Sequence, residues 1–139
     1  MASKIKTAGV EKVHATTYFR KAVQFCEAAA EAYAQERYDA VVVLSIHAGI
    51  NAADAACIGV GTRKCIDSHE RAADLLEEVG SHSREFTEAA KQLRLLLAQK
   101  NAIEYENKRA TRKDAEVGVR RCENLVGWTK NTLVTAKLL

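Results

Sequence analysis

The sequence predicts an all-α protein, folded as an antiparallel bundle of four to five helices. Three observations support this prediction. The 139-residue chain has no proline, the residue that most often interrupts a helix. Apolar residues recur at three- and four-residue steps along most of the chain, which is the spacing of one buried helix face. Hydrophobic residues make up 47% and charged residues 28% of the sequence, a composition typical of a globular domain with a core.

The chain is expected to hold one domain. Residues 1–14 are polar and lack a clear period, so we expect a flexible N-terminal tail there, followed by a single bundle domain over residues 15–139. No stretch has the length and apolarity of a signal peptide, and no segment is expected to span a membrane. Four cysteines without such a signal predict a cytoplasmic location.

The first helix is predicted to begin at Thr16 or Thr17, which can cap it, and to end near Gln35. Residues spaced by three and four positions fall on one face of a helix, and that face is expected to be buried. The apolar residues with this spacing are Tyr18, Ala22, Phe25, Ala29 and Ala32 or Tyr33.

The second helix is predicted from about Tyr38 to Ile58. It contains a β-branched run at residues 41–43, but about twenty apolar and alanine-rich residues in succession favour a helix over a strand. Because it is apolar almost all round, we expect it to be the central and most buried element. Gly59 and Gly61 are expected to end it.

Three further helices follow, each opened by a polar residue. The third is HERAADLLEEV, the fourth carries an apolar stripe that continues into KNAIEYEN, and the last begins after the basic segment KRATRKD. The expected caps are Asp67 or Ser68, then Ser81 or Ser83, then Thr111 or Asp114. The stripe of the fourth helix is Phe86, Ala89, Ala90, Leu93, Leu96 and Leu97.

Three polar residues share a narrow face of the apolar second helix. His47, Asn51 and Asp54 follow the spacing i, i+4, i+7. Buried polar groups need hydrogen-bond partners, so this row predicts a network between helices, a wet groove or an interface.

The end of the fourth helix gathers polar groups where a simple bundle would place leucine. Counting about 100° per residue from Leu93, Lys100 and Glu104 return to within about 20° of the apolar stripe. Asn101 and Tyr105 lie on its flank. We interpret this group as a candidate binding face. The alternative is that the stripe ends here, with Lys100 extending into solvent and pairing with Glu104.

A basic turn, Lys108, Arg109, Arg112 and Lys113, separates the last two helices. It could hold a phosphate backbone, although charge runs at helix ends are commonly just solvated. The net charge of +3 neither supports nor excludes an RNA partner. The cysteines lack the paired spacing of a zinc site, and no phosphate-binding glycine loop occurs, so we expect no metal and no cofactor.

The pattern resembles the HEPN superfamily (higher eukaryotes and prokaryotes nucleotide-binding domain). The resemblance runs from about Tyr18 to Leu133 and rests on YFRKAVQFCEAAAEAYAQERYDAVVVLSIHAGINAADA, then SHERAADLL, then KNAIEYEN and a final helix. It implies a helical bundle that usually dimerises. Active members are metal-independent ribonucleases, often toxins paired with a nucleotidyltransferase antitoxin. Their motif is an arginine, a following polar residue and a histidine four to six positions after the arginine.

In this chain the place of that motif is held by Lys100, Asn101 and Tyr105. Lysine keeps the charge of arginine but loses its bidentate fork. A phenol, with a pKa near 10, is a poor proton shuttle at neutral pH compared with imidazole. No histidine occurs from Lys91 to the C-terminus, so a shift of register does not restore the motif.

We therefore expect a binding or interaction module without nuclease activity, which contacts RNA, a nucleotide or a partner protein through the Lys100–Tyr105 face. A homodimer is expected, because a twofold dimer is the commonest solution for such a surface. The alternative is an endoribonuclease, the toxin of a toxin–antitoxin pair, that uses Lys100, Asn101, Tyr105 and His47. The candidate binding residues are His47, Asn51, Asp54, Lys100, Asn101, Glu104, Tyr105, Lys108 and Arg109.

Overall fold

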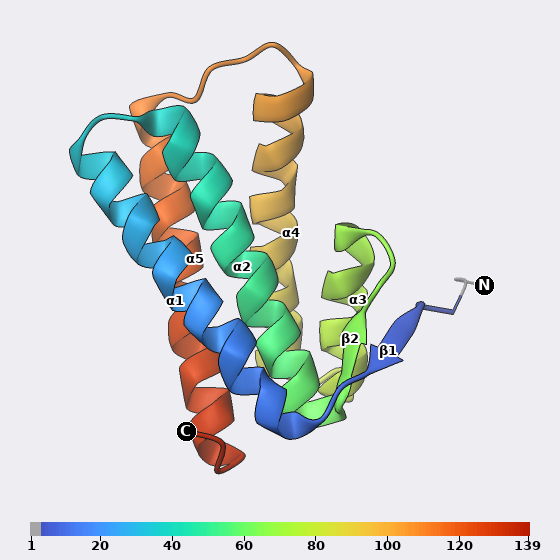
Figure 1. Cartoon of the computed structure of the whole chain (residues 1–139). Helices are drawn as coiled ribbons and strands as arrows, with labels where there is room; N and C mark the ends of the chain where they lie inside the picture. The colour runs from blue at the N-terminus through green and yellow to red at the C-terminus, as the bar shows by residue number, and fades with distance from the viewer. Residues whose placement is uncertain (1–3) are drawn as a thin grey trace.

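The computed structural model describes residues 4–139 and shows a bundle of five helices with one small sheet (Figure 1). The predicted all-α, antiparallel bundle is confirmed. The helices are α1 (Ala15–Ala34), α2 (Tyr38–Gly61), α3 (His69–Val79), α4 (Arg84–Tyr105) and α5 (Arg112–Thr135). The short elements are strands β1 (Thr7–Gly9) and β2 (Arg63–Cys65) and the 3-10 turn η1 (Lys12–His14).

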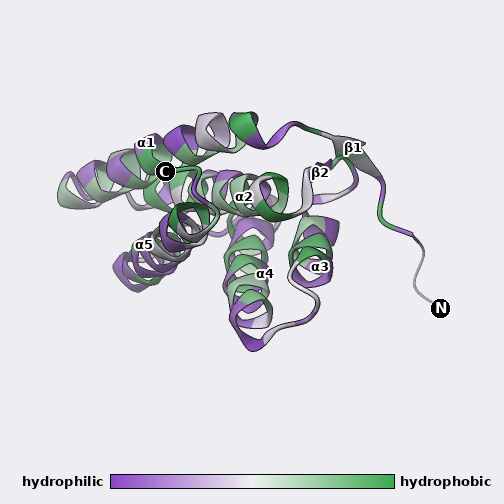
Figure 2. Ribbon diagram, turned by 90° about the horizontal axis from the view of Figure 1, so that it is seen from below, coloured by the Kyte–Doolittle hydropathy of each residue, from purple (hydrophilic) through white to green (hydrophobic). Residues whose placement is uncertain are grey.

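Helix α2 forms the centre of the bundle, as its composition predicts. It contacts each of the other four helices. Figure 2, which looks along the bundle, shows α1 and α5 on one side of it and α3 and α4 on the other. Although α2 is long and apolar enough to cross a membrane, 78% of its most apolar window is buried inside the protein. Its hydrophobicity is therefore accounted for by the core.

The end of α2 differs from the prediction. The helix continues through Gly59 to Gly61. Thr62 is its C-cap and has a left-handed backbone conformation, with φ 53°. Gly59 lies inside the helix at a point of close packing. A Cβ there would lie 2.5 Å from Leu133 Cδ2. Glycine inside a buried helix is tolerated where a neighbour approaches this closely.

The expectation of an unstructured tail over residues 1–14 is wrong for the described part, residues 4–14. Strand β1 pairs antiparallel with β2, with Thr7 opposite Cys65, and η1 leads directly into α1. Ile5 and Val10, on either side of β1, pack against the core. A strand of three residues is too short to show a period, so the sequence pattern could not predict it.

The start and the buried face of α1 also differ in detail. The helix begins at Ala15 as a continuation of η1, and neither Thr16 nor Thr17 caps it. Phe19 and Cys26 are buried in place of the neighbouring aromatic residues Tyr18 and Phe25, which are only half-buried. At the other end of the chain, Thr111 caps α5 in a reciprocal capping box with Asp114, as predicted.

Candidate functional site

The Lys100–Tyr105 segment forms the last turn and a half of α4, at the end of the bundle where the chain crosses to α5 (Figure 1). Lys100 is half-buried, Asn101 and Glu104 are exposed, and Tyr105 is 72% exposed. Among residues 4–139, no side-chain hydrogen bond or ion pair engages any of these four residues, so the alternative pairing of Lys100 with Glu104 is not formed. These groups are therefore free to meet a ligand.

The polar row on α2 does not form a shared network. The Asn51 amide donates to the His47 carbonyl of its own helix at 2.9 Å. Asp54, 7% exposed, lies 3.9 Å from the ammonium group of Lys64 on β2. The exposed ring of His47 packs beside Phe25 of α1, with 5.8 Å between ring centroids. Each polar residue thus has a separate partner, and His47 remains open to solvent.

A residue outside the predicted site connects these two groups. His69, the first residue of α3, has its pKa lowered mainly by partial burial and then by the positive charge of Lys100. His47 and Lys64 lower the pKa of His69 further, while the adjacent Glu70 raises it. Side chains from α2, β2 and α4 therefore all interact electrostatically with the His69 imidazole.

The register of the α3–α4 hairpin explains this convergence. Arg94 of α4 bridges Asp74 and Glu77 of α3, with 2.8 Å to the Asp74 carboxylate. From that crossing, Lys100 lies six residues towards the end of α4, and His69 lies five residues towards the start of the antiparallel α3. Both positions are therefore about 8 Å further along the bundle and on the same level. The sequence does not reveal this register, so local spacing does not indicate that His69 lies close to Lys100.

A small pocket of about 170 Å³ lies beside His69, at the corner where β2 leads into α3. Asp54, Lys64 and Cys65 contribute to its lining. Burial raises the pKa of Asp54 to about 6, and the charge of Lys64 offsets part of this effect. The pocket therefore contains a carboxyl group that titrates close to neutrality, next to a lysine and a histidine.

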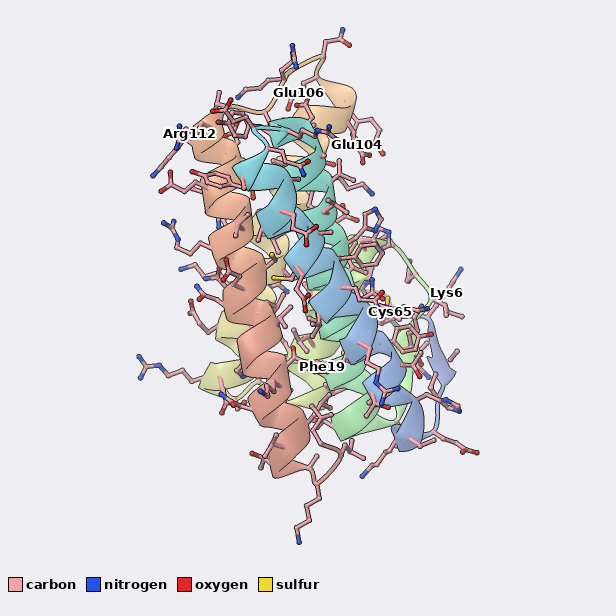
Figure 3. The ribbon with its side chains drawn as sticks, turned by 60° about the vertical axis from the view of Figure 1, so that its left-hand side comes forward. Lys6, Phe19, Cys65, Glu104, Glu106 and Arg112 are labelled. Carbon is pink, nitrogen blue, oxygen red and sulfur yellow. The ribbon has the colours of Figure 1, made fainter. Side chains whose placement is uncertain are left out.

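The basic turn lies apart from this cluster. Arg109 approaches the Asp39 carboxylate at 3.6 Å, and the Ala110 amide donates to the same side chain at 2.7 Å. These contacts fasten the turn to the start of α2. Figure 3 shows Glu104, Glu106 and Arg112 at this end of the molecule, far from Cys65 on β2. Lys108 and Arg109 therefore do not belong to the surface around His69.

Tyr105 and His47 are also separated. Helices α2 and α4 run antiparallel, and Gly49 faces Leu96, since a Cβ at Gly49 would lie 2.6 Å from Leu96 Cδ1. At a rise of about 1.5 Å per residue, Tyr105 lies about 13 Å beyond this crossing and His47 about 3 Å beyond it. The two side chains thus begin roughly 10 Å apart along the bundle. This offset does not favour direct proton transfer between them.

Within the described part of the chain, no three His, Cys, Asp or Glu residues lie close enough together to hold a metal ion. The cationic and imidazole groups around His69, on Lys64, Lys100 and His47, are those that could meet an anion.

Comparison with known protein families decides the assignment of the fold. The family model described as "HEPN domain" matches residues 15–132, which span α1 to the last turns of α5. The chain belongs to the HEPN domain family. No curated protein matches it significantly. Family membership associates this HEPN domain with a nucleotide- or RNA-related role. The matched region contains Lys100, Asn101, Tyr105 and both central histidines, but not strand β1.

Proposed function

We propose that this HEPN domain binds single-stranded RNA without cleaving it. The binding surface, called here the His69 face, consists of His47, Lys64, His69 and Lys100, with Asn101 and Tyr105 at its edge. The observation that carries the proposal is that the α3–α4 register brings Lys100 level with His69, while Lys64 and His69 line the same pocket. Three separate elements supply these groups, and such a concentration of cationic and imidazole groups on one face favours a phosphate-bearing ligand.

The exposed Tyr105 suits an RNA ligand in particular. Its ring is 72% exposed at the end of α4, where an unstacked base could lie against it. Base–aromatic stacking is typical of proteins that bind single-stranded RNA. Lys100 would neutralise a phosphate, and the Asn101 amide one residue further could form a hydrogen bond to a base or sugar.

The absence of cleavage follows from the groups at the motif position. RNA cleavage by its own 2′-hydroxyl needs a base that accepts a proton near pH 7, and a phenol does so less readily than an imidazole. Lys100 provides charge but not the two-pronged contact of an arginine. His47 and Tyr105 are offset by roughly 10 Å along the bundle, so the His47 imidazole does not take the place of the missing base at Tyr105.

An endoribonuclease remains the second candidate, and one observation favours it. His69 lies within electrostatic range of both Lys100 and His47, so an imidazole base beside a phosphate-binding lysine is available. In that case the chain would act as a toxin, and a nucleotidyltransferase antitoxin would be the partner to seek.

The binding proposal predicts that Lys100→Gln weakens the affinity for a single-stranded RNA oligonucleotide by about threefold to tenfold, because one phosphate contact is lost. The slope of log K against log salt should also fall by about 0.7. Fluorescence anisotropy measures both. The matched control is Lys91→Gln, an exposed lysine of the same helix, nine residues away and hence on the opposite side. Equal weakening by both substitutions would contradict the proposal.

The same titrations should depend on pH through His69. Because burial and neighbouring cations lower the pKa of His69, the imidazole is mainly neutral at pH 7. A bound phosphate favours its protonated form, so affinity should rise as the pH falls below about 6.5. His69→Gln should weaken this dependence, and the part that remains comes from Asp54 in the same pocket, whose pKa burial raises to about 6. Gel analysis of the same mixtures should show intact RNA; cleavage that Lys100→Gln abolishes would overturn the proposal in favour of the nuclease.

We further propose that the domain forms a homodimer, as expected for this family. Ile66, which lines the pocket beside His69, and Tyr105, at the end of α4, are both exposed and open to a partner chain. Multi-angle light scattering at micromolar protein should give twice the chain mass of 15.3 kDa. A mass equal to one chain over that concentration range would reject the dimer, without affecting the proposal for RNA binding.

A further inference from the structure

Two of the four cysteines face each other inside the bundle. The sulfur atoms of Cys26 on α1 and Cys122 on α5 are 3.2 Å apart, although the residues are separated by 96 positions in the sequence. Both are buried, at 8% and 0% exposed. The two helices are in contact, and Figure 1 shows α1 crossing in front of α5.

The surroundings of the pair favour one of the two sulfurs as a thiolate. The Cys122 sulfur can accept a hydrogen bond from the Cys26 thiol at 3.2 Å. As a neutral thiol it also donates to the Val119 carbonyl at 3.3 Å, and ionisation gives up this second bond. The hydrogen bond from Cys26, helped by the Ser45 hydroxyl, lowers the pKa of Cys122, against the opposing effect of burial. Donating that hydrogen bond raises the pKa of Cys26. Cys122 is thus the better nucleophile of the pair.

The buried Ser45 hydroxyl strengthens this assignment. Its oxygen has no hydrogen-bond partner of standard geometry among the described residues. A buried hydroxyl without a partner calls for an explanation, and a thiolate on Cys122 would supply an acceptor for it. Here it faces the sulfur that would carry the negative charge.

We propose that Cys26 and Cys122 form a reversible redox modification site, which closes to an intramolecular disulfide when the cell meets a peroxide. A disulfide bond is about 2.05 Å long, so the sulfurs need to approach by only about 1.1 Å. Rotation about the side-chain bonds can supply this approach without separating the two helices.

The reaction balances with hydrogen peroxide as the oxidant. The Cys122 thiolate attacks one peroxide oxygen, the O–O bond breaks, and the departing hydroxide takes a proton to become water, leaving a sulfenic acid on Cys122. The Cys26 sulfur then attacks the Cys122 sulfur, and the second oxygen leaves as water with the Cys26 proton. In total, two thiols lose two electrons and peroxide gains them. A dithiol reductant reverses the change by thiol–disulfide exchange.

The access of a small oxidant is limited to the margin of the pair, where Cys26 keeps 8% of its surface exposed. A groove lined by Tyr33, Val119 and Glu123 lies close by, and Glu123 directly follows Cys122 in the sequence. Cys57 and Cys65, by contrast, have no second sulfur within hydrogen-bond distance in the described chain. Burial also raises the pKa of both. The reaction should therefore select one pair from four buried thiols.

The crosslink joins the first and last helices of the bundle and closes a loop of nearly the whole domain. Closing a loop of this size restricts the unfolded chain strongly, so the oxidised protein should resist unfolding. The crosslink is detected by peptide mass, so its test does not depend on the proposed RNA binding.

To test the proposal, the reduced protein is treated with a small molar excess of hydrogen peroxide, the remaining thiols are alkylated, and the protein is digested with trypsin. We expect peptide 22–37 joined to peptide 122–130, with the mass of two hydrogen atoms lost and full reversal by dithiothreitol. The Cys57→Ser/Cys65→Ser variant, which keeps the pair, should give the same product. Oxidation should raise the thermal unfolding midpoint by on the order of 10 °C, and Cys122→Ser should remove this rise.

Three outcomes would overturn the proposed disulfide. A crosslink that involves peptide 38–63 or 65–71, or sulfinic acid on Cys122 without any crosslink, would overturn the proposal. So would a protein whose four thiols all remain reduced while an added exposed-thiol peptide in the same tube is oxidised. These readouts come from the wild-type chain, so they do not depend on whether a cysteine variant folds.

Discussion

Replacing Leu96 by alanine should lower the free energy of unfolding by about 3 kcal/mol. Leu96 is fully buried on α4, at the point where that helix meets Gly49 of α2. The substitution removes buried apolar surface and leaves a cavity that the rigid helices cannot close. Urea denaturation followed by circular dichroism measures the change.

At the same crossing, we expect the effect of Gly49→Ala on the free energy of unfolding to change sign when Leu96 is also replaced by alanine. In the wild-type background the new Cβ would lie 2.6 Å from Leu96 Cδ1, so overpacking should outweigh the helix-propensity gain and destabilise by about 1 kcal/mol. In the Leu96→Ala background, the methyl group enters the cavity and should stabilise by about 1 kcal/mol.

Gly127→Ala provides the control for this pair of measurements. Gly127 lies in α5 with nothing within 4 Å of its virtual Cβ, so alanine should stabilise the protein by about 0.5–1 kcal/mol in both backgrounds. If Gly49→Ala behaves like Gly127→Ala in both backgrounds, the close contact of α2 with α4 is contradicted.

Asp54→Asn should stabilise the protein at pH 7.5 but not at pH 3.5. Burial moves the pKa of Asp54 from its ordinary 3.8 to about 6, which corresponds to about 3 kcal/mol. Between these values the folded protein holds a proton that the unfolded chain releases. The contribution of Asp54 to stability therefore falls as the pH rises through this window, and it stays low above pH 6.

The amide of asparagine is uncharged at every pH, so the substitution removes this penalty. Lys64 loses an ionic neighbour at 3.9 Å, but its side chain is 28% exposed and can be hydrated. The difference in unfolding free energy between variant and wild type should grow from near zero at pH 3.5 to about 2–3 kcal/mol above pH 6. Glu31→Gln, at an exposed position of α1, should show no such growth. A constant or reversed difference for Asp54→Asn would show that this carboxyl is not desolvated.

The five helices could be predicted because each buries one face over several turns. Leu93, Leu96 and Leu97 repeat at the helical spacing, and the structure buries all three. Strand β1 has no such repeat, and its partner β2 lies beyond α1 and α2 in the sequence. The continuation of α2 through Gly59 depends on Leu133 of α5. Neither feature is visible from local spacing.

The candidate site was predictable to a similar extent. Lys100 and His47 stand out from the sequence because each is polar on an otherwise apolar helix. His69 and Lys64 do not stand out, since their importance comes from the hairpin register of α3 with α4 and from the position of β2. The Cys26–Cys122 contact joins the first helix to the last, and no local signal identifies a contact over that sequence distance.

The most direct test of the His69 face is a titration of the isotope-labelled full chain with a single-stranded RNA oligonucleotide, followed by nuclear magnetic resonance. We predict that the resonances of the His69 imidazole and of the backbone amides of His47, Lys64 and Lys100 shift together while the RNA stays intact. Resonance shifts confined to the basic turn at residues 108–113 would contradict the proposed face. So would the absence of any shift, with wild type and Lys100→Gln giving the same spectra in the presence of RNA.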